Sequence, residues 1–167
     1  MFKINDHVVY QSSGVYKIVD IRKEKDFNKN DTEYYVMEPV FNNNLTTKIP
    51  VNNKKVMMRN VITKDEALAL ITSMPEEETV WLNNNRERSG NFKEALKSGK
   101  TEEWARIIKT IYLHKQERNE LGKTIMKSDE DAMENAEKIL NQELAVALNI
   151  LPEEVPAFIK ERLKDTD

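Results

Sequence analysis

The chain has 167 residues, of which 39% are hydrophobic and 33% are charged, and its formal net charge is −3. This composition is typical of a highly charged globular protein with room for one ordinary domain or two small ones, and it argues against a disordered chain. The chain has no cysteine, which excludes a disulfide framework, and no run of about 18 apolar residues, which excludes a transmembrane helix. It also shows no signal-peptide pattern, so we expect a cytoplasmic protein.

The first 60 residues show the short period of β-strands, with runs rich in β-branched and aromatic residues. Turn-forming residues separate these runs at 11–14, 26–31 and 42–44. The predicted strands cover residues 8–10, 15–21, 33–40, 46–51 and 56–58. Five short strands at close spacing predict a small, strongly bent antiparallel sheet or barrel.

From Thr63 onward the pattern becomes helical. Thr63 and Glu66 have the spacing of a capping box, and Pro75 ends the apolar stripe that follows it. A polar linker then leads to a helix over residues 86–97, and further helices are predicted to begin at Thr101, at Ser128 and near Pro152. The predicted fold class is therefore α+β, with a β-module over residues 1–61 and a helical module over residues 62–167.

Two of the predicted helices carry apolar residues at the spacing of one buried face. In the helix that begins at Thr101 these are Trp104, Ile107, Ile108, Ile111 and Tyr112. In the helix that begins at Ser128 they are Met133, Ala136, Ile139, Leu140, Leu144, Ala147 and Leu148. Both faces predict a shared helical core, in which Trp104 has a structural role.

The residues that catalysis needs are scarce or scattered. His7 and His114 fall in different predicted modules, which leaves no companion for a metal site or a nucleophile relay. His114 is expected to be a solvated surface imidazole on its helix. The glycines form no phosphate-binding loop, so no cofactor, metal ion or small-molecule substrate is expected. The sequence does not predict an enzyme, and a hydrolase with two carboxylates is the alternative it leaves open.

Charge is distributed unevenly along the chain. Residues 1–85 sum to −1, residues 86–127 to +5 and residues 128–167 to −7. Phosphate binding depends on the local density of cations, so the basic middle segment is compatible with a nucleic-acid partner. Solvated faces of charged helices are the alternative interpretation of the same pattern.

Trp81 stands in the polar linker and belongs to no apolar period. One interpretation is that its indole folds back onto a core. The other is that it forms a wedge at a base step in the minor groove, with nearby cations holding the phosphates. The candidate cations are Arg86, Arg88, Lys93 and Lys97.

Several segments, taken in order, resemble the CarD/CdnL regulators of bacterial transcription, whose N-terminal module is shared with transcription-repair coupling factors. In the N-terminal half the resemblance rests on Phe2 to Tyr10 with Gly14, on Glu33 to Val36, and on Lys48 to Val51 before Arg59. In the helical half it rests on Leu96 to Gly99, Gln116 to Arg118, Ala136 to Leu140, and Glu143 to Ala145. The ordered set covers residues 1–150.

The resemblance implies a Tudor-like β-module that docks on the β subunit of RNA polymerase as an added strand or edge contact. Leu45 and Lys48 match positions that face polymerase in the family. Near Lys23 to Lys25 the family often has a basic contact, but Glu24 takes the matching position here, so that Lys25 or Lys23 would serve instead.

The resemblance also implies promoter DNA as a partner of the helical module. The family places a tryptophan in the minor groove at the upstream edge of the melted promoter, and Trp81 is the matching residue. Residues 129–131 are acidic where relatives can be basic, which implies weaker DNA contacts there. A protein that binds the open promoter complex more tightly than the closed one shifts that equilibrium by its differential affinity. The alternative function is a non-enzymatic adaptor whose helical half is only structural.

Overall fold

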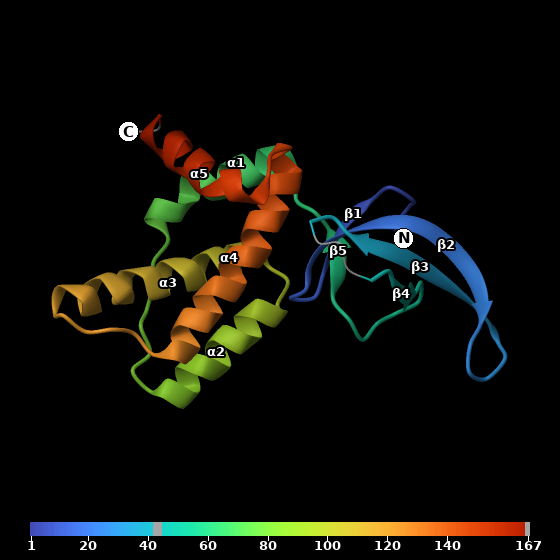
Figure 1. Cartoon of the computed structure of the whole chain (residues 1–167), viewed down its shortest axis with the longest axis horizontal. Coiled ribbons are helices and arrows are strands. Elements are labelled where there is room, and N and C mark those ends of the chain that lie inside the picture. The colour runs from blue at the N-terminus through green and yellow to red at the C-terminus, as the bar shows by residue number, and fades with distance from the viewer. Residues whose placement is uncertain (42–44, 166–167) are drawn as a thin grey trace.

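The computed structural model describes residues 1–41 and 45–165, so the predicted turn at 42–44 lies outside the described residues. A five-stranded antiparallel sheet lies at one end of the molecule and the helices lie at the other, with α4 reaching toward the sheet (Figure 1). This is the predicted α+β fold, with a Tudor-like β-module followed by a helical module.

The sheet has the strand order β4-β3-β2-β1-β5, which leaves β4 at one edge. Its strands are β1 (His7–Tyr10), β2 (Gly14–Lys25), β3 (Asp31–Pro39), β4 (Thr47–Pro50) and β5 (Met58–Asn60). The predicted bounds are most in error for two strands: β2 runs four residues beyond Ile21, and β5 begins at Met58, where the predicted strand ended. The charged end of β2 stays extended because each residue from Ile21 to Lys25 is paired with one of β3.

The sheet uses both of its faces. Because successive side chains of a strand point to opposite sides, Val8 and Val9 of β1 enter different cores. Val8 packs in a small core of the β-module, together with Ile18, Tyr35, Met37 and Ile49. Val9 and Val15 instead belong to the large core that the helices form. The two predicted modules are therefore packed against each other through a continuous apolar cluster.

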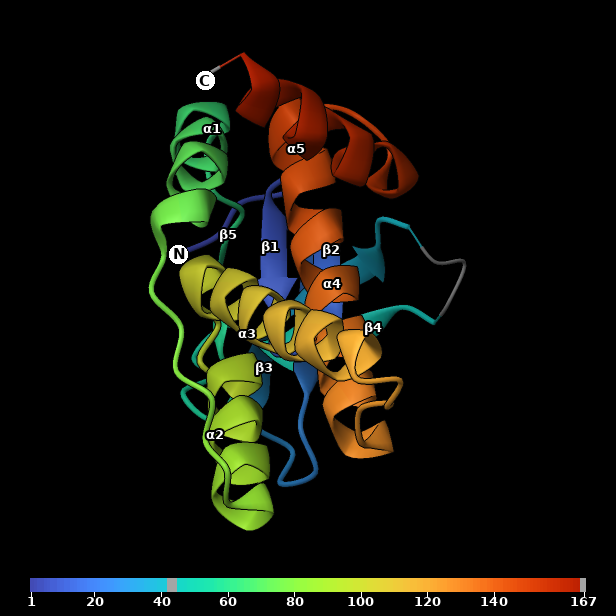
Figure 2. The same cartoon turned by 90° about the vertical axis from the view of Figure 1, so that its left-hand side faces the viewer.

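The helices are α1 (Lys64–Ser73), the 3-10 turn η1 (Met74–Glu76), α2 (Asn85–Lys97), α3 (Thr101–Glu120), α4 (Lys127–Leu148), the 3-10 turn η2 (Pro152–Glu154) and α5 (Val155–Lys164). The predicted capping box is confirmed, because the Thr63 side chain accepts from the Glu66 amide while the Glu66 carboxylate accepts from the Thr63 amide. Figure 2 shows α3 lying across α4, with α2 on one side of α3 and α1 on the other.

The predicted helical core is confirmed in most of its residues. Trp104, Ile107 and Ile111 of α3 are completely buried, and the Trp104 indole donates to the Leu96 carbonyl. The prediction for Tyr112 is wrong, because its side chain is 52% exposed. Tyr112 lies at the edge of an apolar groove on the outer side of α3, which the helical period alone does not distinguish from the core.

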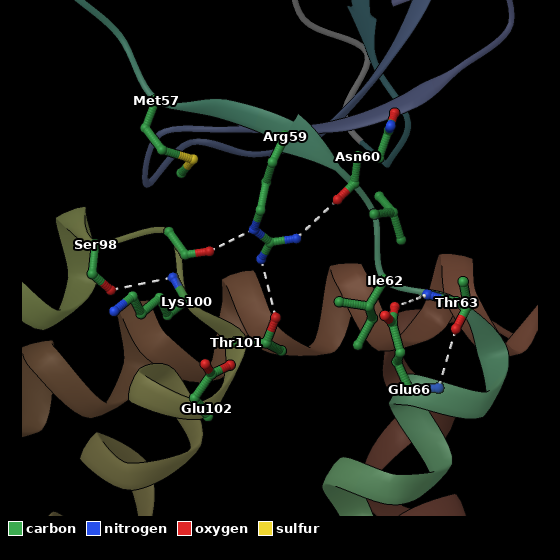
Figure 3. A pocket seen from close by; sticks show the side chains of 12 residues that line it. Met57, Arg59, Asn60, Ile62, Thr63, Glu66, Ser98, Lys100, Thr101 and Glu102 are labelled. Atoms are coloured by element: carbon green, nitrogen blue, oxygen red, sulfur yellow. Dashed lines mark hydrogen bonds between the residues drawn. The ribbon is translucent and has the colours of Figure 1, made fainter.

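A buried ion pair joins the sheet to the helices. Glu143 of α4 has no exposed side-chain surface, and its two carboxylate oxygens accept from the guanidinium of Arg59 on β5. The same carboxylate accepts from the Ile62 amide and from the Thr101 hydroxyl, each at 3.1 Å. Figure 3 shows Arg59 reaching from its strand toward Thr101 and the carbonyl of Asn60. A buried carboxylate with this many donors fixes the sheet relative to α4.

Two glycines permit the close approach at this junction. Gly14 begins β2 with a φ of +117°, and a Cβ there would lie 2.2 Å from the Oε1 of Gln142. That oxygen accepts from the Val15 amide, so the start of β2 and α4 are in direct contact. Gly99, between α2 and α3, has a φ of +72°, and a Cβ there would lie 2.4 Å from the Met57 side chain. A larger residue at either position would strain the backbone and would require the Gln142 or Met57 side chain to move.

Candidate nucleic-acid and polymerase interfaces

The structure places Trp81 against three side chains at the end of the helical module that faces away from α5. Its indole stacks on the His114 imidazole of α3, with ring centroids 3.6 Å apart and planes 9° from parallel. The Arg88 guanidinium carbon lies 4.4 Å from the indole centroid, and the Phe92 ring is tilted against the indole at 6.4 Å. Trp81 is partly buried as a result, which places it between the two interpretations of the sequence.

Arg88 is part of the support for this indole. Its side chain is 3% exposed, and its guanidinium donates twice to Asp129 at the start of α4, over 2.9 and 2.8 Å. A third donation goes to the Leu82 carbonyl, next to Trp81. A buried guanidinium needs such a partner, and this two-bond geometry is the strongest available. The burial of Arg88 contradicts the expectation that it holds a phosphate, and it gives Asp129 a structural reason to be acidic.

His114 also differs from its expected state. The sequence led us to expect a solvated imidazole, but the ring is partly buried against Trp81. Burial is the main cause that lowers the pKa of His114 from its ordinary value, and the nearby Glu117 carboxylate partly offsets it. The cations of Arg118 and Arg88 lower the pKa further. The structure therefore favours a neutral imidazole, which can stack on the indole without being desolvated as a cation.

The other predicted cations lie on the outer face of α2. Arg86, Lys93 and Lys97 are exposed, and none of them forms an ion pair within the part of the chain that the structure describes. Steps of seven and four residues bring the three side chains onto one side of a helix. Phe92 and Ala95 face the core from the opposite side of α2. The structure thus aligns three cations in a row that solvent can reach.

Elsewhere in the basic middle segment, cations are used within the fold. Lys109 donates to the backbone carbonyls of Met74, Pro75 and Glu77, at the end of α1 and the start of the linker. Arg106 pairs with Glu103 one turn earlier on α3. The net charge of this segment therefore overstates the number of cations that a ligand could contact, whereas the row on α2 is exposed and outside the ion pairs of the described residues.

A polar hollow of about 170 Å³ opens beside the indole. Trp81, Asn83, Asn85 and His114 line it on the side of the linker and α3. Arg118 lines it as well, and its guanidinium is oriented by a hydrogen bond to the Thr124 carbonyl. A ligand that contacts the exposed part of the indole could therefore also reach side-chain amides and a cation in the hollow. Such groups bind the sugar and phosphate groups of a nucleic acid.

Two of the residues predicted to face polymerase lie at the free edge of the sheet. Lys48 lies on the edge strand β4, and Leu45 precedes that strand with 88% of its side chain exposed. The Lys48 ammonium lies 2.6 Å from the Glu24 carboxylate of β2. Pro50 lacks an amide proton, which restricts further pairing at the end of β4. The edge is therefore short, but on the side of β4 away from β3 its backbone groups pair with no other described strand.

Lys25 ends β2, at the start of a hairpin whose tip lies on the side of the sheet away from the helices (Figure 1). Asp26 orders this tip by accepting from the amides of Asn28 and Asn30. Phe27 is fully exposed there. Lys25 is exposed as well, so the structure places it on the surface, at the end of β2 and not on the edge strand β4.

Sequence reasoning did not foresee the junction between the sheet and the helices. The residues that form it are Gly14, Arg59, Gly99 and Glu143, together with Gln142 and Thr101. The first four all belong to the segments on which the family resemblance rests. The single sequence does not show that these residues are in contact, because residues that bond across the junction lie up to 127 positions apart in the chain.

Among the residues that the structure describes, no helix is long and apolar enough to cross a membrane. Within the same residues, no three or more His, Asp or Glu side chains gather in a way that could hold a metal ion.

Comparison with protein families agrees with both halves of this architecture. Residues 2–62 match the model of the CarD-like/TRCF RID domain, and residues 67–160 match the model of the CarD C-terminal domain. A comparison with curated proteins gave no significant match. The fold and the matched domains define a regulator of transcription that interacts in general with RNA polymerase and DNA, and the family they belong to is one of non-catalytic regulators. The chain belongs to the CarD family.

Proposed function

We propose that this protein binds the β subunit of RNA polymerase through the free edge of its sheet and stabilises the open promoter complex with Trp81. In this proposal the indole wedges into the minor groove at the upstream edge of the melted DNA, while the cations of α2 hold the adjacent phosphates. The observation that carries the proposal is a partly exposed indole, fixed by Arg88 and His114, together with a row of exposed, unpaired cations on the outer face of α2, the helix that supplies Arg88.

The contacts around Trp81 favour its use as a wedge, because they already restrict the conformations of the side chain and so reduce the entropy that it loses on binding DNA. Ordering a mobile side chain at an interface costs about 0.5–1.5 kcal/mol. Because Trp81 stacks on His114 and on the Arg88 that pairs with Asp129, most of this ordering takes place when the chain folds and not when it binds DNA. A base step that is partly unstacked then receives an indole that is already oriented.

In this proposal, Arg86, Lys93 and Lys97 contact the phosphates. Arg88, the fourth cation predicted for this role, does not, because it is buried. Three phosphate contacts give weak binding to free DNA at physiological salt. Attachment to polymerase through Leu45, Lys48 and Lys25 raises the local concentration of the helical module at the promoter, which compensates for that weakness. The buried junction at Glu143 transmits the position of the sheet to α4 and so to Trp81.

Nuclease footprinting of a polymerase–promoter complex tests this proposal. We expect the protein to extend protection at the upstream edge of the bubble. A variant with Arg86, Lys93 and Lys97 all changed to Gln should lose that protection while still binding polymerase. A matched variant with Lys138, Lys160 and Lys164 changed to Gln, on α4 and α5, should keep it. Equal protection by both variants would contradict the assignment of the DNA contacts.

A further inference from the structure

The helical module contains a second surface that the proposed function does not use. A groove with a volume of about 470 Å³ opens between α3 and α5, with α4 at its floor and the end of α1 beside it. Figure 1 shows α1 and α5 together on one side of α3. The groove shares no lining residue with the hollow beside Trp81, and it contains none of the cations of α2. It is thus separate from the surface assigned to DNA.

The walls of the groove are rows of apolar side chains on two helices. On α3 the row is Ala105, Ile108 and Tyr112, and on α5 it includes Ile159 and Leu163. Spacings of three, four and seven residues are those of ridges along a helix, and two such ridges on either side of a channel match the face of an additional helix. Tyr112 and the adjacent Leu113 also line the groove and are 52% and 39% exposed, so part of its apolar wall is open to solvent.

The charges around the groove are acidic. Glu77, Glu102 and Glu137 all line it, and none of these carboxylates forms an ion pair with another described residue. Lys109 also lines the groove, but its ammonium is already bonded to backbone carbonyls at the end of α1. Burial, followed by the charge of Glu134, raises the pKa of Glu137, and the charge of Lys115 offsets this only in part, so a further cation beside this carboxylate would relieve an unfavourable charge.

We propose that this groove binds an amphipathic helix of a partner protein, with apolar side chains on the inserted face and Lys or Arg on both sides of that face. The two apolar ridges determine the helical shape of the ligand, and the unpaired carboxylates determine its charge. A second copy of this chain is the poorer occupant, because a symmetric contact would bring two acidic grooves together.

Two synthetic peptides of about 18 residues, long enough to form a helix on binding, provide the probe. Both carry the same leucine stripe, and one is flanked by Lys and the other by Glu. Binding to the full chain is measured by fluorescence anisotropy of labelled peptide at low salt. We expect the Lys peptide to bind about tenfold more tightly than the Glu peptide, with a preference that declines as salt is added.

Variants of the groove separate the two contributions. A variant with Glu102→Gln and Glu137→Gln should lose the preference for the Lys peptide, and a matched variant with Glu94→Gln and Glu120→Gln, both outside the groove, should keep it. Tyr112→Ala removes an exposed side chain and should weaken the binding of both peptides. Equal binding of the two peptides to the unchanged protein would overturn the proposal, as would a Tyr112→Ala variant with full affinity.

Sedimentation of the protein without peptide gives the remaining test. The proposal predicts a monomer in which the groove is open. A dimer that Tyr112→Ala dissociates would show that a second copy occupies the groove, and would overturn the assignment to a basic helix. None of these measurements involves polymerase or promoter DNA, so their outcome is independent of the function proposed for Trp81.

Discussion

Removal of the Glu143 carboxylate is predicted to destabilise the whole chain, because this group joins the sheet to the helices. Glu143 is completely buried and accepts from Arg59, from the Ile62 amide and from the Thr101 hydroxyl. Loss of one partner of a buried ion pair costs about 3–5 kcal/mol. Because the Arg59 side chain is 28% exposed and water can reach it, we expect Glu143→Ala to lower the free energy of unfolding by about 3 kcal/mol, the lower end of that range.

Urea unfolding followed by far-ultraviolet circular dichroism measures this change. Glu24→Ala provides the control, since Glu24 belongs to an exposed pair with Lys48, and such pairs contribute at most about 1 kcal/mol. A Glu143→Ala variant that is no less stable than Glu24→Ala would refute the reasoning. Hydrogen exchange adds a second measurement: amides of β1 and α4 should lose the same protection, because Val9 and Val15 lie in the helical core.

Three further predictions concern the proposed interfaces. The pKa of His114 is lowered on folding, so the stability that its neutral form contributes is present above pH 6.5 and is lost as the pH falls below it. In chemical unfolding, the His114→Gln variant should therefore lose less stability between pH 7 and pH 5 than the parent chain does. Changing both Lys93 and Lys97 to Gln should reduce the slope of log affinity for promoter DNA against log salt by about 1 per lysine, whereas Lys138→Gln should leave that slope unchanged. Lys48→Glu should weaken retention of RNA polymerase by the full chain in a binding assay without changing its melting temperature by more than a few degrees, and unchanged retention would remove the free edge of β4 from the polymerase contact.

Features that depend on nearby residues were predictable from the sequence. The capping box at Thr63 and Glu66 needs only a spacing of three residues, and the burial of Trp104 follows from its helical period. The strands of the sheet were predicted by alternation, but their ends were not. The end of β2 is charged, and it is extended only because β3 pairs with it.

Features that depend on distant partners were not predictable. Arg88 has the sequence context of a surface cation, and its burial requires Asp129, 41 residues away. His114 was expected in solvent because no local pattern brings Trp81 onto its ring. The acidic residue at 129 suggested weaker DNA contacts in the sequence, whereas the structure gives it the role of holding Arg88. In each case a long-range contact decides whether a charged or polar side chain is part of the binding surface or of its support.

The lifetime of the open promoter complex in the presence of a Trp81→Ala variant tests the proposed mechanism most directly. If the indole keeps the melted strands apart, the variant should bind polymerase as the parent chain does, but the complex should decay about as fast as it does with polymerase alone. Leu151→Ala, which shortens an exposed apolar side chain at the opposite end of α4, should preserve the longer lifetime. A Trp81→Ala variant that prolongs the lifetime as much as the parent chain would contradict the account.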